Sequence, residues 1–287
     1  MRIITTIREM QAEIQNQKRL SRTIGFVPTM GYLHEGHLTL LNRARQENDL
    51  LVLSIFVNPL QFGPTEDYAA YPRDFERDCA LAEAEGVDYV FFPEVKEMYP
   101  NEPSIKVTVH ERTDVLCGKS RPGHFDGVAT VLIKLFNIVM PDKAYFGRKD
   151  AQQVAVVEGL MDEFNFPIEL VSVEVIREED GLAKSSRNVN LLPEERNQAA
   201  VLHEGLSLAQ KAILQGERDP RKVIALITDL LVNKTNAKID YVELLTYPQL
   251  KPIDKLEGKF IIALAVKFSQ VRLIDNVILE IEDTRYK

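Results

Sequence analysis

Five short apolar runs follow one another along the first 176 residues, with few polar positions inside them. They are IGFVP, LLVLSIFV, YVFFP, KAYFG and IELVSVEVI, which begin at positions 24, 50, 89, 143 and 168. A strand with one wet face alternates apolar and polar residues, whereas a strand buried on both faces is apolar almost throughout. The runs therefore predict strands of a parallel sheet that is covered on both sides.

Apolar residues at helical spacing fill the gaps between these runs. A capping-box pattern, Thr6 with Glu9, opens a first helix. Further helices are predicted over residues 37–48, 71–85, 128–139 and 151–164. Strands that alternate with helices predict the α/β class, with a doubly wound parallel sheet. In such folds ligands bind beyond the carboxyl ends of the strands.

The pattern changes after residue 190. Pro193 suits the first turn of a helix that runs to residue 212, and Asp219–Pro220 opens another that runs to 233. Three later runs, YVELLTY, FIIALAVKF and VRLIDNVILEI, are typical of an antiparallel meander. The change predicts two domains, a doubly wound α/β domain over residues 1–183 and a smaller C-terminal α+β domain over 184–287.

Composition and charge narrow the classes of protein. The chain has 287 residues and a formal net charge of −8, with 45% hydrophobic and 27% charged residues, which is typical of a globular protein. An acidic chain is a poor general binder of nucleic-acid backbones, and no apolar run approaches the roughly 20 residues that span a bilayer. Cys79 and Cys117 form no CxxC pattern. We therefore expect a cytoplasmic protein with reduced thiols, without nucleic-acid or membrane partners.

A pair of histidines follows the first apolar run directly. In PTMGYLHEGH, residues 28–37, His34 and His37 lie three apart where a strand gives way to a helix. A helix N-terminus offers unpaired amides and the positive end of the helix dipole to an anion, and Gly31 and Gly36 allow close backbone approach. The second histidine comes one position too early for the HExxH spacing of zinc proteases. The pattern favours a phosphate site, with two surface histidines as the alternative.

Two further stretches combine cations with small polar residues. GRKDAQQ, residues 147–153, again follows an apolar run, and it offers Lys149 to a phosphate and Asp150 as a helix cap. LAKSSRN, residues 182–188, suits a mobile flap that closes on phosphates. Each stretch taken alone is also compatible with an ordinary charged turn or a solvated loop.

Other candidate site residues are marked by their position directly after a predicted strand or before a predicted helix. Gln61 in FVNPLQFG follows the second run, and its amide is suited to orient a carboxylate or a hydroxyl group, with a plain loop glutamine as the alternative. Arg121 and His124 in RPGHFDG precede a predicted helix. CGKS, from residue 117, lacks the first glycine of a P-loop, and no GxGxxG follows the first run. A P-loop and a dinucleotide fingerprint are thereby disfavoured.

Taken in order along one chain, these motifs resemble the pantoate–β-alanine ligase family of the HxGH nucleotidyltransferase superfamily. The matching stretches are PTMGYLHEGH, FVNPLQFGPTEDYAAYPR, RPGHFDGVATVLIKLFNIVMPDKAYFGRKDAQQ and REEDGLAKSSRN. The resemblance implies a Rossmann-like fold and the ATP-dependent condensation of (R)-pantoate with β-alanine through a pantoyl adenylate, with release of AMP and pyrophosphate. It also implies Mg²⁺, whose ligands the motifs do not assign, and a homodimer.

The resemblance further implies roles for individual residues. The catalytic set comprises His34, His37 as proton donor, Lys149, Ser185 and Arg187. The ATP-binding set comprises Met30, Gly31, Tyr32, Leu33, His34, Glu35, Gly36, His37, Gly147, Arg148, Lys149, Asp150, Ile176, Lys184, Ser185, Ser186 and Arg187. Pantoate is assigned to Gln61 and Gln153, β-alanine to Gln61, and a further pair near the site is Arg121 with His124.

Two positions depart from the family pattern. Residue 148 is arginine where many relatives carry glutamate, and residue 184 is lysine where relatives often carry methionine or leucine. Both add positive charge near the expected triphosphate, so we expect them to tighten the binding of ATP or pyrophosphate. We also expect His34, His37, Lys149 and Arg187 to converge on one polyphosphate.

Two alternative functions stay open on the sequence. Another HxGH nucleotidyltransferase would transfer the nucleotide to a phosphate ester, although two glutamines without a dedicated basic substrate pocket favour a small hydroxy acid. A non-catalytic ATP-sensing module would bind ATP without releasing pyrophosphate. A tRNA synthetase is disfavoured by the acidic charge and the short second domain.

Overall fold

The computed structural model describes residues 1–64, 66 and 68–281. The chain divides into two compact units: Met1–Glu111, Arg121–Arg148 and Val156–Glu174 in the first, and Arg112–Ser120, Lys149–Ala155 and Val175–Lys287 in the second. The domain boundary expected between residues 183 and 184 stays a prediction. Thr65 and Asp67, in the motif that begins FVNPLQFG, lie outside the described residues.

The first unit is built on a parallel sheet, as the apolar runs predict. Within the described residues this sheet has six strands in the order β1-β4-β3-β2-β5-β6, and neighbouring strands are parallel. They are β1 (Arg2–Ile4), β2 (Ile24–Thr29), β3 (Leu50–Ile55), β4 (Tyr89–Phe91), β5 (Lys143–Gly147) and β6 (Glu169–Val173). The five predicted strands are confirmed, whereas the edge strand β1 is too short to give an apolar pattern of its own.

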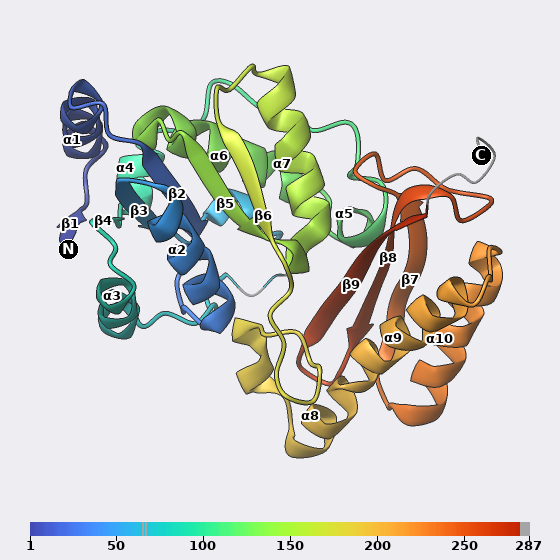
Figure 1. Cartoon of the computed structure of the whole chain (residues 1–287). Coiled ribbons are helices and arrows are strands. Elements are labelled where there is room, and N and C mark those ends of the chain that lie inside the picture. Colours follow the sequence, from blue (N-terminus) through green and yellow to red (C-terminus); the bar gives the residue numbers. More distant parts are fainter. Residues whose placement is uncertain (65, 67, 282–287) are drawn as a thin grey trace. The chain divides into compact units, whose positions relative to one another are not determined.

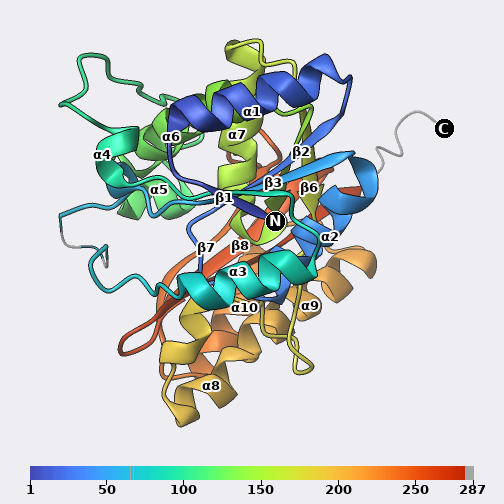
Figure 2. The same cartoon turned by 90° about the vertical axis from the view of Figure 1, so that its left-hand side faces the viewer.

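Helices cover both faces of this sheet, which explains why its strands are apolar almost throughout. Figure 2 shows α1 (Ile7–Arg19) and α6 (His124–Val139) on one side of the strands, with α2 (Glu35–Glu47) and α3 (Phe75–Ala84) on the other. On the second side, apolar residues of α2 and α3 pack in one buried cluster with side chains of β2, β3, β4 and β5. The doubly wound α/β class is thereby confirmed.

The strand order reverses between β2 and β5. These strands are far apart in the sequence, yet Gly25 pairs with Lys143 and Phe26 with Ala144. From β2 the chain proceeds outward to β3 and β4, and from β5 it proceeds in the opposite direction to β6. In this fold class such a switch point is where ligands bind. PTMGYLHEGH continues from the carboxyl end of β2, so the histidine motif begins at the edge where a site is expected.

Two helices begin at other residues than the spacing of apolar positions predicted. α3 begins at Phe75 rather than 71, because the Asp74 side chain caps it by accepting a hydrogen bond from the Arg77 amide. α6 begins at His124 rather than 128, directly after Gly123, whose φ of +79° is a left-handed conformation that glycine adopts without strain. Other helical segments are α4 (Val95–Met98), α5 (Leu116–Ser120), α7 (Ala151–Glu163), and the 3₁₀ turns η1 (Pro59–Gln61), η2 (Arg148–Asp150) and η3 (Ser186–Asn190).

The second unit contains an antiparallel sheet, which confirms the predicted meander. Its described strands are β7 (Lys238–Thr246), β8 (Gly258–Lys267) and β9 (Arg272–Ile281), in that order, and they are drawn in orange to red in Figure 1. The helix predicted over 193–212 is two helices, α8 (Pro193–Ala199) and α9 (Val201–Leu214). α10 (Pro220–Lys234) begins as predicted, with Asp219 as its N-cap.

The central strand β8 is apolar almost throughout because both its faces are covered. On one face Phe260, Ile262 and Leu264 belong to the buried cluster formed with α9 and α10. On the other face Ile261 and Ala263 pack in a second cluster with residues of α5 and the start of α7. Among the described residues, no helix has both the length and the apolarity needed to cross a membrane.

Candidate active site

The two histidines of HEGH are held by the backbone at the start of α2. His34 is the N-cap residue, and its Nδ1 accepts a hydrogen bond from the Gly36 amide at 3.1 Å. His37 Nδ1 accepts from the His34 amide at 3.2 Å, and the ring centroids lie 4.1 Å apart. Because Nδ1 is an acceptor in both rings, the proton of each neutral imidazole lies on Nε2. The pair therefore offers Nε2–H donors of defined tautomer.

These contacts change the source of the expected anion donors. The sequence predicted amides at the helix start that would be open to an anion. In the structure, the N–H groups of His34 and Gly36 donate hydrogen bonds to the imidazole rings instead. The imidazoles thus accept the hydrogen bonds of these backbone amides, and their own Nε2–H groups become the donors for an anion. A Cβ at Gly36 would lie 2.8 Å from His34 Cε1, so the glycine is needed for the ring to fold over the backbone. The phosphate interpretation stays a prediction, with side-chain rather than backbone donors.

A buried carboxylate holds the turn that precedes the histidines. Gly31 and Tyr32 have φ values of +83° and +52°, and Asp78 of α3 accepts hydrogen bonds from the amides of Tyr32 and Leu33, both at 2.7 Å. The Asp78 side chain is buried, and this burial raises its pKa, while the two amide hydrogen bonds act in the opposite direction. Asp78 belongs to no motif, and its only signal in the sequence is an acidic residue between apolar positions of a predicted helix.

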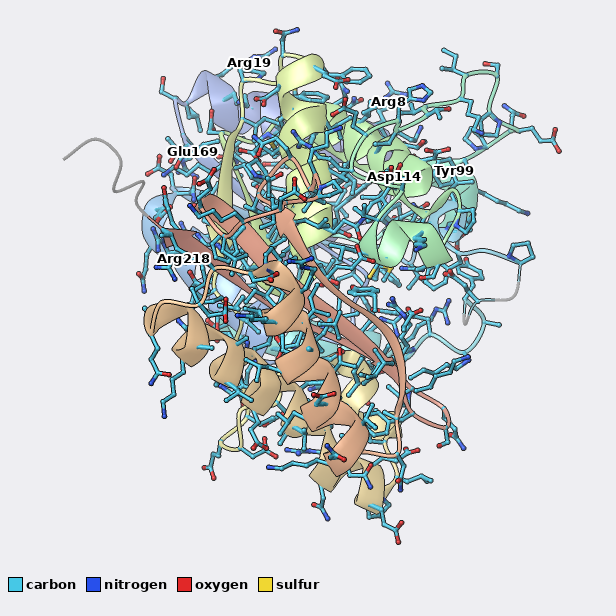
Figure 3. The ribbon with its side chains drawn as sticks, turned by 90° about the vertical axis from the view of Figure 1, so that its right-hand side faces the viewer. Arg8, Arg19, Tyr99, Asp114, Glu169 and Arg218 are labelled. Carbon is cyan, nitrogen blue, oxygen red and sulfur yellow. The ribbon has the colours of Figure 1, made fainter. Side chains whose placement is uncertain are left out.

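Gln61 is held by a second residue that sequence reasoning missed. Its Oε1 accepts from Asn58 Nδ2 at 3.2 Å, and its Nε2 donates to Met30 Sδ at 3.0 Å. Asn58 Oδ1 accepts in turn from the hydroxyl of Tyr99 at 2.9 Å, a residue labelled in Figure 3. The structure therefore brings together Gln61 and Met30, two predicted site residues, and fixes the orientation of the Gln61 amide.

Arg121 and His124 lie against the backbone of Gln61, and their assignment near the site stays a prediction. The carbonyl oxygen of Gln61 accepts from His124 Nδ1 at 2.8 Å, and His124 Nε2 accepts from Arg121 Nη1 at 3.1 Å. A carbonyl can only accept and a guanidinium can only donate, so this histidine is neutral with its proton on Nδ1. Arg121 also binds both carboxylate oxygens of Glu66, at 2.8 and 2.5 Å.

The Glu66–Arg121 pair predicts a pH-dependent contribution to stability. Its hydrogen bonds with Arg121 hold the pKa of Glu66 below its usual range. Glu66 therefore stabilises the fold at pH values above its unfolded-state pKa, and this contribution is lost as the pH falls through its lowered folded-state pKa. We expect Glu66→Gln to be less stable than wild type at neutral pH, with a difference that disappears in acid. Urea unfolding over a pH series measures this.

Glu102→Gln is the matched control, because Glu102 is an exposed residue of the same unit. It should track the wild-type protein across the whole pH series. A stability difference between Glu66→Gln and wild type that stayed constant from neutral to acid pH would contradict the role assigned to the ion pair.

In the second unit, the segment expected to be a flap is folded on itself. Lys184 N donates to the carbonyl oxygen of Ile176 at 2.8 Å, and Arg177 and Ala183 form an antiparallel bridge. Ser185 caps η3 by accepting from the Arg187 amide at 3.3 Å. The predicted residues from Ile176 to Arg187 therefore share one compact segment. The opening and closing of the flap predicted over residues 182–188 stay a prediction.

An ion pair attaches this segment to β9. Arg177 donates to both carboxylate oxygens of the buried Asp275, at 2.7 and 3.0 Å. The next residue, Asn276, donates from Nδ2 to the carbonyl oxygen of Lys149 at 2.9 Å. Consecutive residues of β9 thus hold the backbone at Lys149 and at the base of the 176–187 segment. Neither residue was marked by a sequence motif.

Two neighbouring glutamines on α7 have different surroundings. Gln152 is buried, and it accepts from the Cys117 amide at 2.9 Å and donates to the carbonyls of Arg112 and Val115 at 2.8 Å. It therefore holds the segment that leads into α5. Gln153, assigned to pantoate by resemblance, is the next residue along the helix and is half-buried, so its side chain projects about 100° away.

The two cations that depart from the family pattern each have a carboxylate partner. Arg148 forms an ion pair with Glu174 and donates from Nε to Ser172 Oγ at 3.0 Å. Lys184 Nζ lies 3.2 Å from Glu178 Oε2. A nearby carboxylate offsets part of a cation's field, so the extra positive charge that reaches a ligand is smaller than the sequence alone suggested.

The predicted site residues fall in both units. The first unit holds Met30–His37, Gln61, Arg121, His124, Gly147 and Arg148, and the second holds Lys149, Asp150, Gln153, Ile176 and Lys184–Arg187. The expected convergence of His34, His37, Lys149 and Arg187 on one polyphosphate stays a prediction. Among the residues that the structure describes, no group of three or more His, Cys, Asp or Glu side chains is arranged to hold a metal ion.

Comparisons with known proteins agree with the motifs and with the fold. A model of the Pantoate-beta-alanine ligase family matches residues 2–278. A pantothenate synthetase of Geobacillus sp. (strain WCH70) is 62% identical over 98% of this chain and 100% of its own length. A crystal structure of pantothenate synthetase from Thermus thermophilus has a TM-score of 0.91 and 45% identity, and covers 96% of this chain and 99% of that one.

A third relative carries ligands. The crystal structure of a pantoate-beta-alanine ligase from Francisella tularensis, complexed with beta-gamma ATP and beta-alanine, has a TM-score of 0.78 and 33% identity over 97% of both chains. Three observations now agree: the order of the motifs, the six-stranded parallel sheet of the described residues, and matches along nearly the whole chain. The chain belongs to the pantoate–β-alanine ligase family.

Proposed function

We propose that the protein joins (R)-pantoate to β-alanine at the expense of ATP. A carboxylate oxygen of pantoate attacks the α-phosphorus of ATP and displaces pyrophosphate, which gives pantoyl adenylate. The unprotonated amine of β-alanine then attacks the acyl carbon and displaces AMP, leaving an amide and a proton. The observation that carries this function is the pair of imidazoles of defined tautomer after β2, in a chain that matches the family from residue 2 to 278.

The histidines act on the charge that develops during adenylate formation. Negative charge builds on the oxygens of the α-phosphate and then on departing pyrophosphate. Donors aimed at such oxygens act mainly in the transition state and contribute several kcal/mol each, about 3–4 by analogy with an oxyanion-hole donor. His34 and His37 provide Nε2–H groups for this purpose as hydrogen-bond donors. The proton donation that the resemblance implies for His37 would require an imidazolium, whose Nδ1 could not accept from the His34 amide. No protein nucleophile is required, because pantoate supplies the attacking carboxylate.

The remaining roles follow the family assignment. Gln61 orients pantoate and then β-alanine, and the fixed amide described above supports a role in orientation. Gln153 is the second pantoate ligand. Lys149, Ser185 and Arg187 bind the phosphates, and Ile176 contacts the adenine. Closure of the predicted flap over residues 182–188 would exclude water from the acyl adenylate, which is otherwise hydrolysed.

Mg²⁺ is proposed as the counterion of the ATP phosphates. This ion usually keeps several waters and binds through substrate phosphates with one or two carboxylates, rather than in a cage of protein ligands. When bound, Mg²⁺ neutralises charge on the phosphates, while the chain's own residues orient the nucleotide.

We also propose a homodimer that works in the cytoplasm. The thiols of Cys79 and Cys117 are both free, which supports a reducing compartment. Light scattering of the purified protein should give twice the chain mass of 32.7 kDa. A mass that stayed at one chain over the working concentration range would count against the dimer.

Product analysis tests the proposed reaction. With ATP, Mg²⁺, pantoate and β-alanine, we expect pantothenate and AMP in equal amounts, and ATP–pyrophosphate exchange that requires pantoate but not β-alanine. Exchange supported by a phosphate ester instead of pantoate would favour a different nucleotidyltransferase. Binding of ATP without pyrophosphate release in the presence of pantoate would favour a sensing module.

The cations at positions 148 and 184 are expected to contribute modestly to ATP binding. In the double variant Arg148→Gln/Lys184→Met, we expect the KM for ATP to rise about two- to fivefold, the range of a weak ion-pair contribution. The matched control is Glu174→Gln/Glu178→Gln, which removes the carboxylate partners and should lower this KM. An ATP KM that neither variant changed would contradict the expectation.

A further inference from the structure

The turn between β2 and α2 is fixed from outside by two consecutive residues of α3. Asp78 accepts from the amides of Tyr32 and Leu33, both at 2.7 Å. Arg77 Nη1 donates to the carbonyl oxygen of Leu33 at 2.8 Å, and its guanidinium lies 5.4 Å from the centre of the Tyr32 ring. Both polar backbone groups of Leu33 are therefore held, and the next residue is His34.

The geometry of this turn is matched to a carboxylate. Gly31 and Tyr32 both have left-handed φ values, which are uncommon for residues other than glycine. In this conformation the adjacent amides of Tyr32 and Leu33 both donate to the one carboxylate of Asp78. A Cβ at Gly31 would lie 2.9 Å from Asp78 Oδ2, so the glycine leaves the space that the carboxylate occupies. Asp78 is 1% exposed, so these amides are enclosed with their acceptor and are engaged by the protein itself.

We propose that Asp78 is a positioning residue for ATP, which acts through the turn and sets the place of the His34–His37 ring pair. The chain of contacts runs from the Asp78 carboxylate to the Leu33 amide, to the N-cap residue His34, and to His37 through the His34 amide. A displacement of about 1 Å in catalytic groups can lower a rate about 100-fold. This role rests on the proposed reaction, because the rings are assigned to the phosphates of ATP.

A purely structural role would have different consequences. A carboxylate that only stabilised α3 or the core would, when replaced, lower stability and leave the kinetic constants of the remaining folded enzyme unchanged. A positioning carboxylate should instead affect the constants that involve ATP and leave the apparent affinity for pantoate in place. A change in the constants for ATP without a change in the apparent affinity for pantoate therefore distinguishes a positioning role from a structural role.

The decisive variant is Asp78→Asn, which keeps the size but places an NH₂ donor against one of the two amides. We expect a rise of about tenfold or more in the KM for ATP and a fall of about 100-fold in adenylate formation, measured by ATP–pyrophosphate exchange. The KM for pantoate should stay within about twofold of wild type. Asp74→Asn is the matched control, because Asp74 caps the same helix at Arg77 without an assigned contact to the turn, and it should change neither KM.

A second measurement does not depend on activity. Hydrogen exchange at the amides of Tyr32 and Leu33 should be about ten times faster or more in Asp78→Asn than in wild type or Asp74→Asn, because their acceptor has been replaced. If Asp78→Asn does not fold, Gly31→Ala provides the same test, since its Cβ displaces the carboxylate. It should show the same selective loss for ATP.

Two results would overturn the inference. One is unchanged hydrogen exchange at Tyr32 and Leu33 in the Asp78→Asn protein. The other is an Asp78→Asn or Gly31→Ala enzyme whose constants for ATP stay within about twofold of wild type. Failure of the proposed reaction gives a different result, because the wild-type protein would then show no pantoate-dependent exchange while the amides of the turn still responded to Asp78→Asn.

Discussion

His37→Asn is expected to leave the protein folded and to lower pantoate-dependent ATP–pyrophosphate exchange about 10²- to 10³-fold, the usual effect of removing one donor to a developing oxyanion. The asparagine Oδ1 can take the place of His37 Nδ1 and accept from the His34 amide, a contact of 3.2 Å in the structure. The start of α2 therefore keeps its hydrogen bond. What the variant lacks is the Nε2–H donor alone.

Two companion variants separate the functions of the ring. His37→Gln provides a neutral amide at about the reach of Nε2, so it should retain more exchange activity than His37→Asn. His37→Ala loses both functions, and it should also lose about 0.5–2 kcal/mol of stability, as when a helix cap is removed. Thermal unfolding and exchange assays on the same preparations distinguish the loss of structure from the loss of chemistry.

Near-normal exchange in a folded His37→Asn protein would contradict the assignment of His37 as a hydrogen-bond donor to the phosphates. The ring pair would then serve only to cap α2. The same variant with low activity and a markedly lower melting temperature would be uninformative about the donor, which is why the asparagine is preferred to alanine.

Gly127→Ala should disable the proposed pantoate site at Gln61 through the backbone. Gly127 lies on α6, and a Cβ there would be 2.3 Å from the carbonyl oxygen of Leu60 and 2.6 Å from the amide nitrogen of Gln61. These are backbone atoms of η1, which cannot turn aside as a flexible side chain can. We expect η1 to shift, the KM for pantoate to rise at least about tenfold, and the free energy of unfolding to fall by about 1–3 kcal/mol.

The effect should be larger than that of removing one contact, because η1 and α6 are joined in several ways. Asn58 Nδ2 donates to the carbonyl oxygen of Gly127 at 3.0 Å, while His124 donates to the carbonyl oxygen of Gln61 at 2.8 Å. A shift of η1 strains both hydrogen bonds. Steady-state kinetics with pantoate as the varied substrate, together with urea unfolding, measure the two consequences.

Gly63→Ala is the matched control for Gly127→Ala. It lies two residues after Gln61 in the same segment, and the nearest atom to its added Cβ would be Glu66 Cγ at 3.7 Å, an ordinary contact distance. We expect near-wild-type values of the pantoate KM and of stability. A Gly127→Ala protein that matched this control in both measurements would show that η1 tolerates the displacement and that Gln61 is not held through α6.

Some features of this protein are local, and its sequence predicts them. The apolar runs predicted β2 to β6 because strands buried on both faces cannot carry polar side chains without cost. The capping of α1 by Thr6, of α2 by His34 and of α10 by Asp219 depends on residues close together in the chain. The motifs that carry the family resemblance are also short and contiguous, so they can be recognised in the sequence.

Tertiary structure decided how the candidate site residues are held. The turn before the two histidines is held by Asp78, 45 residues from Leu33 in the chain. Gln61 and His124 are 63 residues apart. Spacing along a sequence cannot show such pairs, because a hydrogen bond depends on where folded elements bring its donor and acceptor. The sequence thus determined the elements, the family and the kinds of donor, whereas the packing of α3 and α6 within the first unit decided how the turn before His34 and the backbone of Gln61 are held.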